Sequence, residues 1–206
     1  VYQQRDVVIK KSTNATGKDD IEREAVFMQT LRSPHVVELV AWTTIDGAPV
    51  LCVEYAPHGS FNQHITADYA FNKRVLLDVA RGMEFLHRCN VVHNDLKPEN
   101  VLIFALDANA PVVAKIADFG SCQVEAVSRG ESLGTIAYIA PEVRRRPGTK
   151  AGDVYSFGMM MYAACRRLPS PYPNPPFRLF FDVLDFVEEQ RHLERGEIAD
   201  ADWHII

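Results

Sequence analysis

Residues 93–100 read HNDLKPEN, and short apolar runs at residues 91–92 and 101–104 flank them. Because such runs are expected to be buried, the polar residues between them form a loop held in a rigid frame. The loop brings together an acid (Asp95), an amine (Lys97) and an amide (Asn100). Such a frame suits the positioning of a nucleophile beside a phosphate and a metal ion. Taken alone, the stretch leaves open an ordinary solvated turn.

A second polar stretch, Asp118-Phe119-Gly120, follows a predicted short strand at residues 115–117. A carboxylate at the end of a strand, followed by a glycine that permits a sharp turn, suits a magnesium ligand. Turns of this composition are common, so the tripeptide alone is a weak signal. Its position shortly downstream of Asp95 strengthens it.

Upstream of the loop, hydrophobic periodicity predicts a small β-rich region with one helix. We expect a buried strand at 7–9, a helix at 21–32 that ends at Ser33-Pro34, and antiparallel strands at 36–42 and 49–55. The turn between the paired strands is expected at Asp46-Gly47. A break at residues 56–60 then predicts a boundary between an N-terminal lobe at 1–56 and a C-terminal lobe at 57–206.

Downstream, helical patterns predict an amphipathic helix at 72–88 and a helix at 153–165. The second helix is apolar almost all round, which predicts burial on every side. A last helix is expected at 179–193, after a proline-rich stretch. The fold class is therefore α+β, with two unequal lobes.

The composition of the chain excludes some classes of binding partner and indicates the cellular compartment. The net charge of −5 argues against non-specific binding to nucleic acid and against adhesion to anionic lipid. The longest apolar run, residues 159–165, is far too short to cross a membrane. The four cysteines lack metal-ligand spacing and indicate a reducing compartment, so an intracellular, cytoplasmic protein is expected.

The loop at residues 93–100 and the tripeptide Asp118-Phe119-Gly120 are followed by Ala140-Pro141-Glu142 and by the run DVYSFG at residues 153–158. In order and spacing, these four stretches resemble the protein kinase family. The resemblance covers residue 7 to about residue 177. Lys97 and the segment 134–138 resemble the serine/threonine branch of the family. The resemblance implies a two-lobed kinase fold, ATP and Mg²⁺ as cofactors, and transfer of the γ-phosphoryl of ATP to serine or threonine hydroxyls of a protein substrate.

The resemblance also implies roles for individual residues. Asp95 would accept or orient the proton of the substrate hydroxyl, and Lys97 would lie against the transferring phosphate. Asn100 and Asp118 would hold the magnesium ions. Thr135 would hydrogen-bond to the Asp95–Lys97 pair. The resemblance assigns Thr135 and Tyr138 to the surface that binds the protein substrate. It assigns four residues to an apolar column that joins the lobes: Met28, Leu39, His93 and Phe119.

On the nucleotide side, Lys10 matches the family's strand lysine on the ATP phosphates. Lys11 is the alternative, but strand alternation sends the two to opposite faces. Glu24 lies on the apolar face of the helix at 21–32, where an unpaired carboxylate would cost several kcal/mol. A Lys10–Glu24 pair is therefore predicted, although Glu24 could instead reach water at the edge of that face.

The remaining nucleotide-pocket residues also come from the resemblance. Glu54 and Ala56 would offer backbone hydrogen-bonding groups to adenine, and Val53 would stand at the back of the pocket, where its small side chain leaves room. Val8 and Leu102 are assigned to the same pocket. All five positions are equally compatible with ordinary strand packing.

One departure from the family pattern concerns regulation. Asn94 stands where many relatives have an arginine that binds a phosphate on the activation segment. An uncharged amide cannot make that bidentate contact. We therefore predict that activity does not depend on phosphorylation between Ser121 and Thr135, although Ser128 and Ser132 could be modified.

Two further departures concern the ends of the chain. No glycine precedes Lys10, where the family has a glycine-rich loop over the ATP phosphates, and no final helices follow the proline-rich stretch, so Glu142 lacks its expected arginine partner. Both ends are expected to be truncated, so this stretch alone could be an inactive fragment. The missing loop also keeps open a pseudokinase that only binds partners, while the retained polar residues favour an enzyme. A kinase of small molecules is the third alternative.

Overall fold

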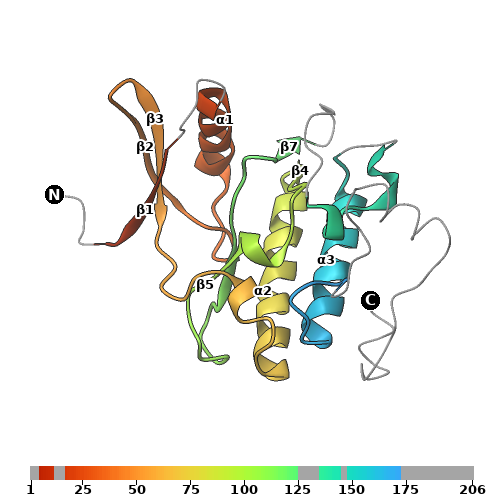
Figure 1. Cartoon of the computed structure of the whole chain (residues 1–206). Helices are drawn as coiled ribbons and strands as arrows, with labels where there is room; N and C mark the ends of the chain where they lie inside the picture. Colours follow the sequence, from red (N-terminus) through yellow and green to blue (C-terminus); the bar gives the residue numbers. More distant parts are fainter. Residues whose placement is uncertain (1–4, 12–16, 125–134, 145–147, 173–206) are drawn as a thin grey trace.

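The computed structural model describes residues 5–11, 17–124, 135–144 and 148–172 (Figure 1). The predicted helix at 179–193 lies outside these ranges. A small lobe contains three strands and a helix: β1 (Val7–Lys11), α1 (Gly17–Thr30), β2 (Leu39–Ile45) and β3 (Ala48–Glu54). The strands form an antiparallel sheet in the order β1-β3-β2. Asp46 and Gly47 have positive φ angles of 52° and 75°, so the predicted tight turn between β2 and β3 is confirmed.

The burial predicted for β1 is wrong. Val7, Val8 and Ile9 are 38%, 42% and 52% exposed. β1 is an edge strand of the described sheet and pairs with β3 alone, while α1 packs over β3 and β2. An apolar run indicates a strand here, but it does not reveal that the strand lies at the edge.

Helix α1 presents the predicted face to the core. Ile21, Ala25, Met28 and Leu31 are all buried, and Glu22 is exposed. The helix starts earlier than predicted and carries Asp19 and Asp20 in its first turn, where acidic side chains stabilise a helix N-terminus.

Residues 35–37 connect α1 to β2, and they also pair with the large lobe. Val36 forms a parallel bridge with Ile116, the Val37 N–H donates to the Ile116 carbonyl at 2.8 Å, and the Ile116 N–H donates to the His35 carbonyl at 2.9 Å. The strand predicted at 36–42 therefore begins only at Leu39, because residues 35–37 pair elsewhere. We call residues 35–37 the lobe connection.

The described part of the large lobe is built around two helices, α2 (Tyr69–Arg88) and α3 (Lys150–Cys165). The Asp68 side chain caps α2 by accepting the N–H groups of Ala70 and Phe71. Two two-stranded sheets lie beside the helices: β4 (Val91–Val92) with β7 (Gln123–Val124), and β5 (Val101–Ile103) with β6 (Ala114–Ile116). Short 3-10 helices complete the described lobe: η1 (Phe61–Gln63), η2 (Pro98–Asn100), η3 (Ile136–Tyr138) and η4 (Pro141–Arg144).

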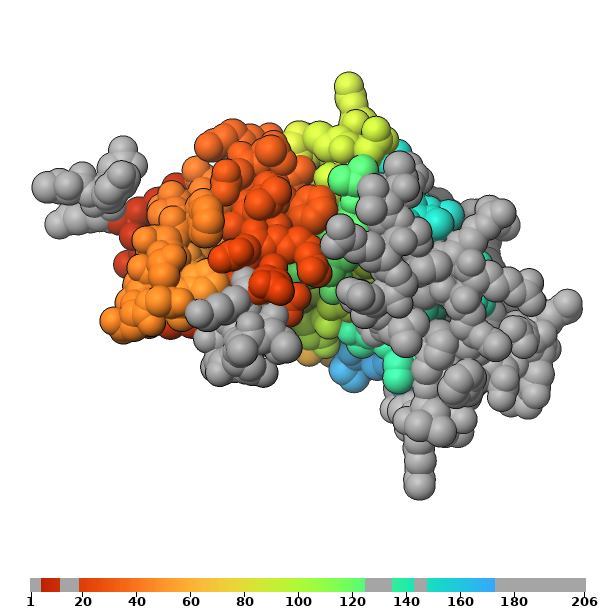
Figure 2. Space-filling model, turned by 90° about the horizontal axis from the view of Figure 1, so that it is seen from above, coloured from red at the N-terminus to blue at the C-terminus, as the bar shows by residue number. Residues whose placement is uncertain are grey.

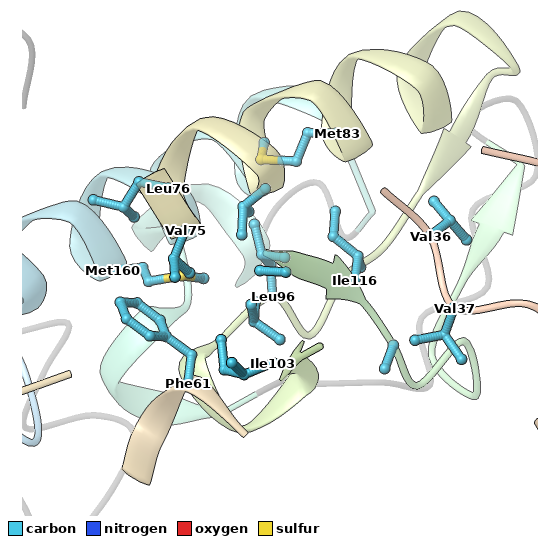
Figure 3. Close-up of a cluster of buried hydrophobic side chains, with 14 of the residues drawn as sticks. Val36, Val37, Phe61, Val75, Leu76, Met83, Leu96, Ile103, Ile116 and Met160 are labelled. Atoms are coloured by element: carbon cyan, nitrogen blue, oxygen red, sulfur yellow. The ribbon is translucent and has the colours of Figure 1, made fainter. Parts of the chain in front are cut away.

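The main core lies between α2, α3 and the β5–β6 pair (Figure 3). The predicted stripe of α2 is buried: Val75, Val79, Met83 and Leu86. Gly82 brings α2 against the lobe connection, because a Cβ there would lie 2.8 Å from both the His35 carbonyl and Ile116 Cδ1. The small lobe and the large lobe occupy opposite ends of the molecule (Figure 2).

Helix α3 is buried along much of its length, but not on every side as predicted. Met160, Ala163 and Ala164 are fully covered, whereas Val154 is 57% exposed. Among the described residues, α2 and η3 cover only part of its circumference. None of the helices that the structure describes combines the length and the apolar character that a bilayer-spanning segment needs.

Candidate active site

The loop at residues 93–100 is anchored to helix α3. Asp153 is 2% exposed, and its carboxylate accepts the backbone N–H groups of His93 at 2.8 Å and Asn94 at 2.9 Å. His87 Nε2 lies 2.8 Å from the same carboxylate. Sequence reasoning assigned no role to Asp153. The available signal was a carboxylate in an otherwise apolar helix, which needs buried partners.

Asp95 is held by donors on both carboxylate oxygens. Lys97 Nζ and Asn100 Nδ2 lie 2.7 Å and 3.0 Å from Oδ2. The Thr135 N–H and hydroxyl donate to Oδ1 at 2.9 Å and 3.0 Å. Lys97 Nζ also lies 2.7 Å from Thr135 Oγ1, so the predicted bonding of Thr135 to the Asp95–Lys97 pair is confirmed. The side chain of Asp95 keeps 15% exposure.

Asn100 brings the second polar stretch to the same place. Its Nδ2 also donates to the Asp95 carbonyl at 2.8 Å, and its own carbonyl accepts the Ala117 N–H at 2.8 Å. Asp118 follows Ala117 directly. Asp95, Asn100 and Asp118 therefore meet in one region: Asp95 and Asp118 follow β4 and β6, and Asn100 directly precedes β5.

Asp118 sits in an uncommon backbone conformation, with φ of 64°. An aspartate tolerates this region better than most residues, and such geometry is concentrated at functional sites. Its Oδ1 accepts a bond from Lys10 Nζ at 2.8 Å. Burial alone would raise the pKa of Asp118, but the hydrogen bond and charge of Lys10 outweigh it and hold the pKa below its ordinary value.

The predicted Lys10–Glu24 pair is present, and Lys10 rather than Lys11 makes it. Lys10 Nζ lies 2.7 Å from Glu24 Oε2, and Glu24 is only 4% exposed. The alternative in which Glu24 reaches water is therefore wrong. Burial by itself would lower the pKa of Lys10, but the charge of Glu24 and the bond to Asp118 raise it above the ordinary value. Glu24 Oε1 also accepts the Phe119 N–H at 3.2 Å.

The residues assigned to the nucleotide pocket come from both lobes. Val8 on β1 pairs with Val53 on β3, and Val53 is half-buried. Leu102 is the central residue of β5 in the large lobe, also half-buried. Ala56 follows β3 at the predicted boundary between the lobes and is 8% exposed.

Glu54 has a role that sequence reasoning missed. Its buried carboxylate lies 2.6 Å from Lys115 Nζ and 3.1 Å from an Arg5 nitrogen, and it accepts the Glu38 N–H at 2.8 Å. The Glu54 N–H donates to the Glu38 carbonyl at 3.1 Å, so that backbone group is already bonded within the small lobe. An acid at the end of an apolar strand was the available signal, since such a carboxylate needs a cation.

The two residues assigned to the substrate floor are placed differently. Thr135 faces Asp95, as described above. Tyr138 is 5% exposed, and its carbonyl accepts the Ser156 hydroxyl at 2.7 Å. Burial raises the pKa of the Tyr138 phenol. Tyr138 is thus packed beneath the surface predicted to bind the substrate, and its own side chain is almost wholly buried.

Part of the apolar column predicted between the lobes is present, namely the contact between His93 and Phe119. The rings of His93 and Phe119 meet edge to face with centroids 5.6 Å apart. Met28 from the small lobe shares one buried cluster with Phe119, and Leu39 packs against that cluster.

Comparison with known proteins gives a consistent result. Residues 3–179 match the family described as "Protein kinase domain". The chain is 32% identical over 171 residues to the probable serine/threonine-protein kinase gdt4 of Dictyostelium discoideum, covering 79% of this chain and 10% of that protein. It is 30% identical over 204 residues to the serine/threonine/tyrosine-protein kinase HT1 of Arabidopsis thaliana, covering 90% of this chain and 50% of that protein.

A second Dictyostelium discoideum protein, the probable serine/threonine-protein kinase gdt2, is 30% identical over 211 residues, which cover 98% of this chain and 13% of that protein. The chain therefore spans about a tenth of the length of the two Dictyostelium relatives and half of the Arabidopsis one. The extent of these matches, together with the two-lobed α+β fold, shows that the chain belongs to the protein kinase domain family.

Proposed function

We propose that this chain is the catalytic part of an ATP-dependent protein kinase that transfers the γ-phosphoryl of ATP to serine or threonine hydroxyls of a protein substrate. The observation that carries the proposal is the convergence of Asp95, Asn100 and Asp118 beside the Lys10–Glu24 pair. The pairing of Lys97 with Thr135 supports the serine/threonine class, as do the names of the relatives. We place the boundary between the lobes at residues 56–57 and propose an intracellular location.

The residues present fit a magnesium–nucleotide complex. Mg²⁺ prefers oxygen ligands and is held by one or two protein groups together with substrate phosphates. No cluster of three histidine, cysteine or acidic residues lies in the part of the chain that the structure describes, so a fully protein-bound metal is not indicated there. Asp118 offers a carboxylate that is 46% exposed. Because Asp95 engages the nitrogen end of the Asn100 amide, its oxygen end is the one that can bind a metal.

Each group of the chain then has a defined task. When bound, Mg²⁺ offsets the charge of the phosphates. Lys10 and Lys97 supply ammonium groups for phosphate oxygens, and Glu24 holds Lys10 in place. Asp95 orients the substrate hydroxyl and takes its proton as the oxygen bonds to phosphorus and the bond from phosphorus to the ADP oxygen breaks. Thr135 keeps the Asp95 carboxylate in the required orientation.

The proposed nucleotide pocket takes a face from each lobe. Val8 and Val53 come from the small lobe, Leu102 from the large lobe, and Glu54 and Ala56 from the segment where the lobes join. Aromatic bases bind between apolar side chains with a few backbone contacts to fix their orientation, and this composition suits adenine.

The test replaces Asp118 by alanine in the full-length protein and measures transfer of phosphate from ATP to a library of serine- and threonine-containing peptides. We expect transfer to fall roughly a hundredfold or more, because the metal-binding carboxylate is gone. Asp107→Ala is the matched control, since Asp107 is an exposed aspartate outside the site. Unchanged transfer in the folded Asp118→Ala protein would refute the proposal.

A further inference from the structure

Strand β7, at the start of the activation segment (residues 121–135), runs antiparallel to strand β4. Strand β4 leads into the catalytic loop at residues 93–100. Val91 pairs with Val124, and Val92 pairs with Gln123, in the β4–β7 sheet. Each step forward along β4 is matched by one step back along β7. Val92 is the last paired residue of β4 before the loop that carries Asp95.

The same register continues beyond the strands through side chains. The Cys122 thiol donates a hydrogen bond to the His93 carbonyl, with 3.7 Å between the sulfur and the oxygen. At the next step, Asn94 Nδ2 donates to the Ser121 carbonyl at 2.8 Å. The ladder therefore reaches the residue before Asp95 on one side and the residue after Gly120 on the other.

Asn94 is well suited to end this ladder. Its backbone N–H donates to Asp153 at 2.9 Å, which fixes the residue to helix α3. Its φ of 66° lies in the left-handed region, which asparagine tolerates better than most residues. With its backbone anchored, its half-buried side chain is directed at the activation segment rather than into solvent.

We propose that Asn94 is a positioning residue for phosphoryl transfer: its amide bonds the turn 118–121 to the catalytic loop and so keeps Asp118 in register with Asp95 and Asn100. This inference rests on the proposed function. Asn94 touches neither nucleotide nor substrate and acts through Asp118. The bond is between neutral groups and involves only residues 94 and 121.

The test compares two substitutions in the full-length protein. Asn94→Asp keeps the shape and the tolerance of positive φ but replaces the donor by an oxygen that repels the Ser121 carbonyl. Asn94→Gly keeps the backbone conformation accessible and removes the amide without adding charge. Asn90→Asp is the matched control, because Asn90 also has a positive φ of 57° and its Oδ1 already accepts a bond from Lys150.

We expect kcat to fall roughly tenfold in both Asn94 variants, the size of one hydrogen bond, with the KM for the peptide unchanged. The Mg²⁺ concentration for half-maximal rate should rise several-fold, because Asp118 is displaced from its position. A merely structural role would not move this magnesium dependence. Asn90→Asp should leave all three quantities unchanged.

Backbone amide exchange provides a readout that does not depend on catalysis. Residues 119–123 should exchange faster in Asn94→Asp than in the wild type. Unchanged kinetics in both Asn94 variants, or an equal loss in Asn90→Asp, would overturn the proposal. If the wild type transfers no phosphate, the proposed function fails. The exchange rates still test whether the Asn94–Ser121 bond holds the turn 118–121: faster exchange in Asn94→Asp supports this, and unchanged exchange rejects it.

Discussion

The two halves of the candidate site are held in different ways. In the large lobe, Asp95 and Lys97 are 15% and 20% exposed, and strands β4, β5 and β6 around them are largely buried. In the small lobe, every residue of β1 is exposed, and the Lys10 side chain is 43% exposed. Asp95, assigned to proton transfer, and Lys97, assigned to the transferring phosphate, stand on the core of the molecule, whereas Lys10, assigned to the ATP phosphates, stands on an edge strand.

This difference implies a division of labour. A catalytic group gains from a rigid frame, because its geometry need not be reorganised during the reaction. A nucleotide-binding group can move with a lobe that closes over its ligand. Substitutions in the large-lobe half should therefore affect chemistry and folding strongly, and those on β1 other than at Lys10 should have milder effects.

The largest effect is expected at Asp95. Asp95→Asn keeps the side-chain shape but removes the proton acceptor, so kcat should fall roughly 10²- to 10⁴-fold while ATP binding is retained. Steady-state kinetics and a separate ATP-binding assay measure the two quantities. Glu99→Gln alters an exposed acid of the same loop and serves as control. Equal activity of Asp95→Asn and wild type would remove Asp95 from the mechanism.

Folding stability provides the next comparison. Leu86→Ala empties a fully buried position of α2 and should lower the free energy of unfolding by about 3 kcal/mol. Ile9→Ala on β1 changes a side chain that is 52% exposed and should cost less than about 0.5 kcal/mol. Chemical denaturation measures both. Similar costs for the two variants would contradict the contrast between the lobes.

A smaller effect concerns the titration of Asp118. Because Lys10 outweighs the effect of burial and holds the Asp118 pKa below its ordinary value, Lys10→Met should raise that pKa. Lys11→Met, on the neighbouring exposed residue, should leave it unchanged. The carboxyl carbon chemical shift of Asp118, followed against pH by NMR, measures the change. An unshifted Asp118 in Lys10→Met would mean that the ion pair does not form in solution.

The same shifts set the pH window of the pair. The folded pKa of Asp118 is depressed, so its contribution to stability is present above the unfolded value and is lost as pH falls through the folded pKa. The folded pKa of Lys10 is raised, so its contribution is present below 10.5 and is lost as pH rises through the folded pKa.

No effect is expected from the activation-segment serines. Ser128 and Ser132 lie in residues 125–134, outside the described structure, and Asn94 carries no charge to bind a phosphate there. Turnover of a Ser128→Ala/Ser132→Ala double variant should equal that of wild type in a peptide phosphorylation assay. A collapse of the rate would show that phosphorylation there is required.

The sequence predicted contacts that follow from periodicity or from the family resemblance. The family resemblance supplied Lys10, and helical spacing together with the need to pair a buried charge selected Glu24 as its partner. The resemblance predicted the bonds of Thr135 to Asp95 and Lys97. Local patterns could not predict features that depend on the assembled sheet: the exposure of β1, the pairing of Val36 with Ile116 and the bonds of Glu54.

The lobe connection has a mechanical consequence. With the lobe boundary that we propose, the chain crosses between the lobes at residues 56–60, and residues 35–37 pair with Ile116 at a second point. Two lobes attached at two separate points can rotate relative to each other only about the line through those points. Asp118 lies two residues beyond Ile116 and therefore close to this line, and Lys10 Nζ of β1 lies 2.8 Å from its Oδ1. A swing of the small lobe about this line would therefore change the distance between Lys10 Nζ and the Asp118 carboxylate only slightly.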